Sequence, residues 1–148
     1  MNPQIIFRNC IRLPLLLIMG MFAVSANANA DVVVIVSAKS PVTRLTAEQA
    51  AKIFLGKVDS FPNDGVALPI DQAEGSTVRD EFYAKVVRKS SSQLTAYWAK
   101  IIFTGDGHPP IRLEGDVAVR NAIANNQNAI GYIDKNAVDS SVRVVLAP

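Results

Sequence analysis

The chain has 148 residues, of which 49% are hydrophobic and 19% charged, and its formal net charge is +2 at pH 7. This length and composition fit one folded domain. They disfavour a nucleic-acid partner, because the longest basic cluster is Arg88-Lys89 and nucleic-acid binding needs a basic face or stripe. One cysteine, Cys10, and one histidine, His108, leave no candidate for a cysteine or histidine metal site.

The first thirty residues have the three parts of a secretory signal peptide. Two arginines precede an apolar run from Leu13 to Val24, and an A-x-A sequence follows at Ala28–Ala30. The run is shorter than the roughly 20 apolar residues that a membrane-spanning helix needs. We therefore expect residues 1–30 to be removed on export to the periplasm and residues 31–148 to form the mature domain. Cys10 and the two arginines would be lost with the signal peptide.

The first half of the mature region alternates strand and helix patterns. Five consecutive β-branched residues, Val32 to Val36, predict a strand buried on both faces, as in a parallel or mixed sheet covered by helices. A capping box at Thr46 and Gln49 predicts the start of a helix that Gly56 ends. A short strand is expected over residues 66–70, with its proline at the strand end or on a sheet edge.

The second half continues this alternation and completes the predicted domain. Apolar residues at helical spacing predict a helix after Thr77 and a longer one that begins with a capping box at Ser90. A further helix is expected over residues 116–124, followed by strands over residues 129–133 and 142–147. Strands and helices joined by short links predict a single α/β domain with a mixed sheet and flanking helices.

A turn between the second strand and the following helix is the best candidate for a binding site. Gly75, Ser76 and Thr77 lie where the first N–H groups of a helix have no partner within it and carry partial positive charge. Such a turn can bind an anion, and Arg79 could reach back to it. The same residues are also typical of an ordinary helix cap, and Arg79 could instead pair with a neighbouring carboxylate such as Asp71.

Residues for catalysis are scarce. Serines are scattered, the mature region has no cysteine, and the single histidine lies in a Gly/Pro loop, so a hydrolase triad is not expected. The carboxylates near the turn, Asp71, Glu74, Asp80 and Glu81, are explained by helix capping and surface charge. We therefore expect a protein that is not an enzyme and has no cofactor.

Four segments resemble, in the same order, the periplasmic phosphate-binding proteins, which are the solute receptors of phosphate-specific ABC transporters. They are "LTAEQAAKIFLGKVDSFPNDG", "PIDQAEGSTVRDEFY", "AYWAKIIFTG" and "NAIGYI". The likeness extends over residues 32–145 and is closest to short, single-domain relatives within the type II periplasmic binding protein superfamily. It implies a fold similar to the second lobe of a two-lobed receptor.

The resemblance also implies a site. In that family phosphate lies between two lobes, and the second lobe supplies an arginine and a Ser-Gly-Thr turn. Gly75, Ser76 and Thr77 match the turn in altered order, and the position of the arginine falls on Asp71 or Gln72. An unpaired Asp71 at about 4 Å from an anion would cost around 4 kcal/mol at an effective dielectric constant near 20. A helix end offers only about 0.3–1 kcal/mol at an exposed site.

Two hypotheses follow. The first is a periplasmic protein that binds phosphate or another small oxyanion weakly at Gly75, Ser76, Thr77 and Arg79, completed by a second copy or a partner. The alternative is a periplasmic-binding-protein-like module without a ligand that serves in protein interaction or sensing in the cell envelope. Neither requires a metal, a nucleic acid or a membrane span after removal of the signal peptide.

Overall fold

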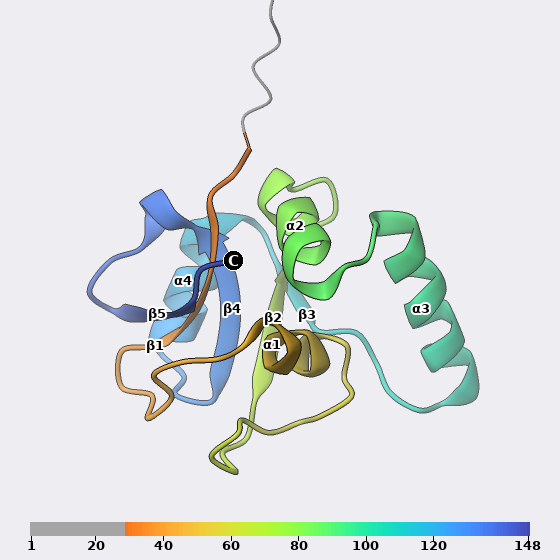
Figure 1. Cartoon of the computed structure of the whole chain (residues 1–148), viewed down its shortest axis with the longest axis horizontal. Coiled ribbons are helices and arrows are strands. Elements are labelled where there is room, and N and C mark those ends of the chain that lie inside the picture. The colour runs from red at the N-terminus through yellow and green to blue at the C-terminus, as the bar shows by residue number, and fades with distance from the viewer. Residues whose placement is uncertain (1–28) are drawn as a thin grey trace, which may run out of the picture.

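The computed structural model describes residues 29–148, which form a five-stranded mixed sheet with helices on both faces (Figure 1). The strand order is β3-β2-β4-β1-β5. The strands are β1 (Val32–Ser37), β2 (Leu68–Gln72), β3 (Ile111–Leu113), β4 (Ala129–Asp134) and β5 (Val142–Leu146). β1 is antiparallel to β4 and β5, whereas β2 is parallel to β3 and β4. The predicted α/β domain with a mixed sheet is confirmed.

The predicted signal peptide lies outside the described residues, apart from Asn29 and Ala30. Within residues 29–148, no helix combines the length and the apolar character needed to cross a bilayer.

Strand β1 lies inside the sheet and is buried along its whole length, as its β-branched residues predict. Because successive side chains of a strand point to opposite faces, the strand contributes to two cores. Val34 packs in the core beneath α1 and α2, whereas Val33 and Ile35 pack in the core beneath α4. The sheet is therefore the middle layer of three.

The helices are α1 (Ala47–Phe54), α2 (Thr77–Phe82), α3 (Ser91–Thr104) and α4 (Gly115–Ala124). The π-helical turn η1 (Tyr83–Val87) continues α2, and the short 3₁₀ helix η2 (Lys135–Ala137) follows β4. Capping boxes at Thr46 and Ser90 start α1 and α3, as predicted.

Helix α4 lies unusually close to β4 at Gly131. A Cβ atom at this position would lie 2.9 Å from Cγ1 of Val119 and 3.1 Å from Cδ1 of Ile123. Glycine is therefore the residue that permits this close approach.

Strand β2 lies two residues later than expected, and its proline, the second residue of the strand, is at an edge position. Pro69 pairs with Ile130 of β4. On the other side of β2, pairing with β3 begins only at Ile70. At Pro69 the strand thus has a single neighbour, and a residue without an N–H group is tolerated where no second ladder needs it.

Helix α3 is less buried than its apolar stripe predicts. Among its residues only Leu94 and Trp98 are buried, and Ile102 is 56% exposed. In Figure 1 this helix, drawn in blue-green, lies at the outer side of the layer that contains α1 and α2. The strand that follows it, β3, was not predicted, because three residues after a Pro-Pro pair give no alternating pattern.

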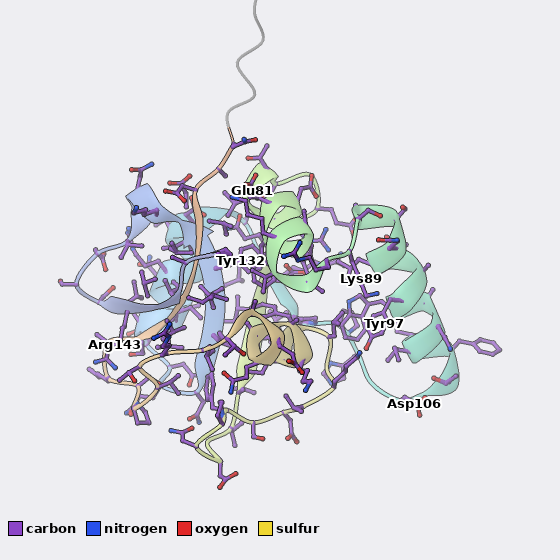
Figure 2. All side chains as sticks on the ribbon, viewed as in Figure 1. Glu81, Lys89, Tyr97, Asp106, Tyr132 and Arg143 are labelled. Carbon is purple, nitrogen blue, oxygen red and sulfur yellow. The ribbon has the colours of Figure 1, made fainter. Side chains whose placement is uncertain are left out.

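The loop after β1 is held by one arginine from β5. The Nη1 of Arg143 donates to the carbonyl oxygen of Ser40 at 2.8 Å, and its Nη2 donates to that of Ala38 at 3.1 Å (Figure 2). Three carbonyl groups outside the sheet are satisfied in this way, since Val42 also accepts from Nη1.

Candidate functional site

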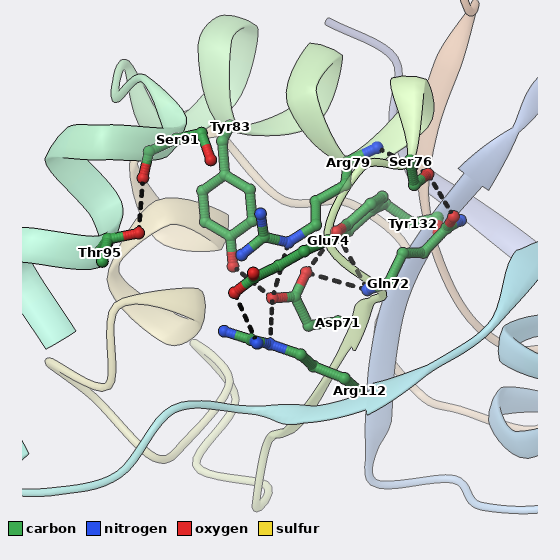
Figure 3. A network of polar contacts seen from close by, with 10 residues as sticks. All are labelled: Asp71, Gln72, Glu74, Ser76, Arg79, Tyr83, Ser91, Thr95, Arg112 and Tyr132. Atoms are coloured by element: carbon green, nitrogen blue, oxygen red, sulfur yellow. Dashed lines mark hydrogen bonds and ion pairs between the residues drawn. The ribbon is translucent and has the colours of Figure 1, made fainter.

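Asp71 is the centre of a polar network at the end of β2 (Figure 3). Its side chain is 2% exposed. Oδ2 accepts hydrogen bonds from Nε of Arg79 at 3.3 Å and from the hydroxyl group of Tyr83 at 3.2 Å. Oδ1 accepts from the hydroxyl group of Tyr132 and from the backbone N–H of Gln72. The carboxylate is thus buried with a donor on every side.

This arrangement corrects the expectation that Asp71 opposes an anion at the turn. The carboxylate lies beneath the turn and is paired with Arg79, so its charge is compensated within the protein. Burial raises the pKa of both tyrosine hydroxyl groups, and the negative charge of Asp71 raises it further. Both phenols therefore stay protonated and act as donors to the carboxylate.

Arg79, expected at the site, is 3% exposed and lies with its guanidinium carbon 5.0 Å from the centre of the Tyr83 ring. Burial acts to lower its pKa, but the charge of Asp71 raises it, and the net direction is upward. Its side-chain hydrogen bond uses Nε. Within residues 29–148 its two terminal amino groups donate no hydrogen bond.

Within residues 29–148, two backbone N–H groups of the turn have no hydrogen-bond partner. Gly75 is exposed and has a φ of +85°, which glycine adopts readily. Thr77 is also exposed, and Ser76 is half-buried. The N–H groups of Gly75 and Thr77 donate to no group in the part of the chain that the structure describes. These N–H groups and the Thr77 hydroxyl group are therefore available to a ligand.

Ser76 caps the helix rather than pointing freely at solvent. Its hydroxyl group accepts from the N–H of Arg79 at 3.3 Å and donates to Oε1 of Gln72 at 2.8 Å. The amide nitrogen of Gln72 in turn donates to Oδ1 of Asp116 at 2.7 Å and to the carbonyl oxygen of Tyr132. The helix cap predicted for this residue is present, and it ties the turn to β4 and α4.

A second arginine, Arg112 of β3, also reaches the network. Its Nη1 lies 2.7 Å from Oε1 of Glu74, and its Nε lies 4.0 Å from Oδ2 of Asp71. The side chains of Arg112 and Glu74 are 40% and 64% exposed. The site thus contains two arginines, one buried and one at the surface.

The four residues that the sequence indicated, Gly75, Ser76, Thr77 and Arg79, are neighbours in the chain. Ser76 caps the backbone N–H of Arg79, whereas the guanidinium group of Arg79 is buried against Asp71. Sequence reasoning missed Arg112 and the role of Tyr132. Tyr132 carried a usable signal, because a tyrosine within the apolar strand "AIGYI" needs a partner for its buried hydroxyl group. For Arg112 there was no usable signal in the sequence, since β3 itself was not predicted.

The remaining candidates lie elsewhere. Glu81 pairs with Lys85 at 2.6 Å along one helix face, and His108 is exposed in the loop after α3. Across residues 29–148, no cluster of three or more histidine, cysteine or acidic side chains could hold a metal ion.

Solved structures of phosphate transport proteins share this fold. One is assigned as a phosphate ABC transporter substrate-binding protein from Clostridium perfringens and contains bound phosphate. It is 26% identical, with a TM-score of 0.62 over 78% of this chain and 44% of that one. An ABC-type phosphate transport receptor from Vibrio cholerae is 20% identical, with a TM-score of 0.61 over 78% of this chain and 45% of that one.

PstS from Borrelia burgdorferi is 16% identical, with a TM-score of 0.58 over 78% of this chain and 46% of that one. The chain therefore spans less than half the length of the proteins it resembles, and its domain is like one part of a periplasmic binding protein. No family model matches the sequence, and no curated protein matches it.

Proposed function

We propose that the protein is a periplasmic solute-binding protein of the phosphate-receptor type, exported through residues 1–30. It binds phosphate or another small oxyanion at Gly75, Ser76, Thr77 and Arg79. One observation carries the proposal: Asp71, the residue that would repel an anion, is buried and paired with Arg79. The fold similarity to a protein with bound phosphate supports the same ligand class. The protein acts as a receptor and not as an enzyme.

The affinity of this site is expected to be low. Charge-assisted hydrogen bonds from arginine and backbone N–H groups to an oxyanion are about twice as strong as neutral ones. However, Gly75 and Thr77 are exposed, so water screens these contacts. We expect a dissociation constant of about 1 mM, which corresponds to roughly −4 kcal/mol.

Isothermal titration calorimetry of the purified protein with phosphate and sulfate tests the proposal, with chloride at equal ionic strength as the reference. Thr77→Val removes one donor and is expected to weaken binding about three- to tenfold, as the loss of one hydrogen bond does. Thr95→Val is the matched control, because Thr95 is an exposed threonine of α3 that bonds only to the Ser91 carbonyl oxygen. A folded protein that gives no heat with either anion at about 10 mM, well above the expected constant, would contradict the proposal.

A second candidate function, protein interaction, is favoured by an apolar cavity of about 430 Å³ between α3, β2 and the loop after α3. Tyr97 and Trp98 line it, and Figure 2 shows Tyr97 between α3 and the rest of the domain. Close by in the chain, Phe103 is 91% exposed and Ile111 is 72% exposed. Of these two, Ile111 lines the cavity, and a large exposed apolar residue in such a position is typical of an interaction surface.

The occupant that we propose for this surface is a second copy of the chain, because Phe103 offers an aromatic side chain that such a cavity can accept. Sedimentation velocity over a range of concentrations is expected to show a dimer that Phe103→Ser dissociates. Val144→Ser, at a 37% exposed position of β5, is the control and should leave the dimer intact. A protein that stays monomeric at every concentration would contradict this second function.

A further inference from the structure

The ion pair between Glu74 and Arg112 lies at the candidate site itself. Glu74 directly precedes Gly75, and its carboxylate oxygen lies 2.7 Å from Nη1 of Arg112. Both side chains are substantially exposed, at 64% and 40%. Exposed ion pairs contribute little to stability, so this one can open without loss of the fold.

The charges of Asp71, Arg79 and Arg112 balance only when Glu74 is counted. Arg79 and Arg112 approach the same oxygen of Asp71, at 3.3 Å and 4.0 Å. One buried carboxylate thus faces two guanidinium groups, which leaves one positive charge in excess. Glu74 supplies the second negative charge, from a flexible side chain at the surface.

We propose that Glu74 is an internal competitor, whose carboxylate occupies the position on Arg112 that a small oxyanion takes on binding. This inference rests on the proposed function and adds Arg112 to the residues that bind the ligand. A guanidinium group recognises a carboxylate and a phosphate through the same pair of N–H donors, so the carboxylate of Glu74 marks an oxyanion position. When Glu74 moves away, Asp71, Arg79 and Arg112 together carry a single net positive charge.

Calorimetric titration with inorganic phosphate at constant ionic strength tests this competition. Glu74→Gln is expected to raise the affinity about three- to tenfold, because the anion no longer displaces a charged partner. Arg112→Gln is expected to lower the affinity by a similar factor. Glu48→Gln is the matched control, since Glu48 forms an exposed ion pair with Lys52 on α1, at 2.7 Å, and the net charge changes equally. This control should alter the affinity less than about twofold, as a remote exposed charge does.

The double variant separates competition from general electrostatics. In a protein that carries Arg112→Gln, Glu74 has no arginine with which to pair. Adding Glu74→Gln should therefore raise the affinity for phosphate little further. An undiminished gain in the double variant, or no gain in the single variant, would overturn the inference while wild-type binding still supports the proposed function. Absence of phosphate binding in wild type and in Glu74→Gln alike would overturn both.

Discussion

Replacing Asp71 with alanine is expected to lower the free energy of unfolding by about 3–5 kcal/mol, the range found when one partner of a buried ion pair is removed. The alanine variant leaves the guanidinium group of Arg79, 3% exposed, without its carboxylate. The hydroxyl groups of Tyr83 and Tyr132 lose their acceptor at the same time. A buried charge without a partner and two buried donors without an acceptor all act against folding.

Urea denaturation of the purified variants measures this effect. Asp80→Ala is the matched control, because Asp80 is an exposed aspartate in the first turn of α2, and its removal should change stability by less than about 1 kcal/mol. Combining Asp71→Ala with Arg79→Met should restore part of the loss, since no charge is then left buried alone. A loss below about 1 kcal/mol for Asp71→Ala would show that the pair does not organise the turn.

Replacing Phe82 with alanine is also expected to destabilise the protein by about 3–5 kcal/mol, the usual range for a buried phenylalanine. Phe82 is fully buried and stacks on the ring of Tyr132, with the ring centres 4.0 Å apart and the planes 6° from parallel. Its ring also meets the ring of Phe54 at 4.7 Å. Because Tyr132 donates to Asp71, the cavity would loosen the support of the candidate site as well as the core.

Val117→Ala provides the control for this second variant, since Val117 of α4 is 58% exposed and should contribute less than about 0.5 kcal/mol. Urea denaturation monitored by the fluorescence of Trp98 compares the two. Equal stability of Phe82→Ala and Val117→Ala would contradict the packing described beneath α2.

Local patterns predicted most of the fold because the responsible forces are local. The β-branched run of β1 and the capping boxes at Thr46 and Ser90 act within a few residues, and all three are present as expected. The burial of α3 was overestimated, because helical spacing reports an apolar side but not whether another element covers it. β3 was missed because a three-residue strand depends on its pairing with β2.

The candidate site was predicted only in part, because its electrostatics depend on contacts between distant segments. From the sequence, Asp71 is a negative charge four residues before Gly75, and repulsion of an anion follows. In the structure it is held by Arg79 of α2 and by Tyr132 of β4, which lies 61 residues away in the chain. No local sequence pattern predicts that pairing. Because the pairing compensates the charge of Asp71, the predicted repulsion of an anion at the turn no longer follows.

The central proposal is that the turn above the Asp71–Arg79 pair receives an oxyanion. A titration of the ¹⁵N-labelled protein with phosphate, followed residue by residue by NMR, tests this claim directly. If the turn binds phosphate, we expect saturable shifts of the backbone N–H signals of Gly75 and Thr77 and of the side-chain signal of Arg112, with chloride producing none. Shifts confined to other parts of the domain, or no saturable shift at all, would contradict it.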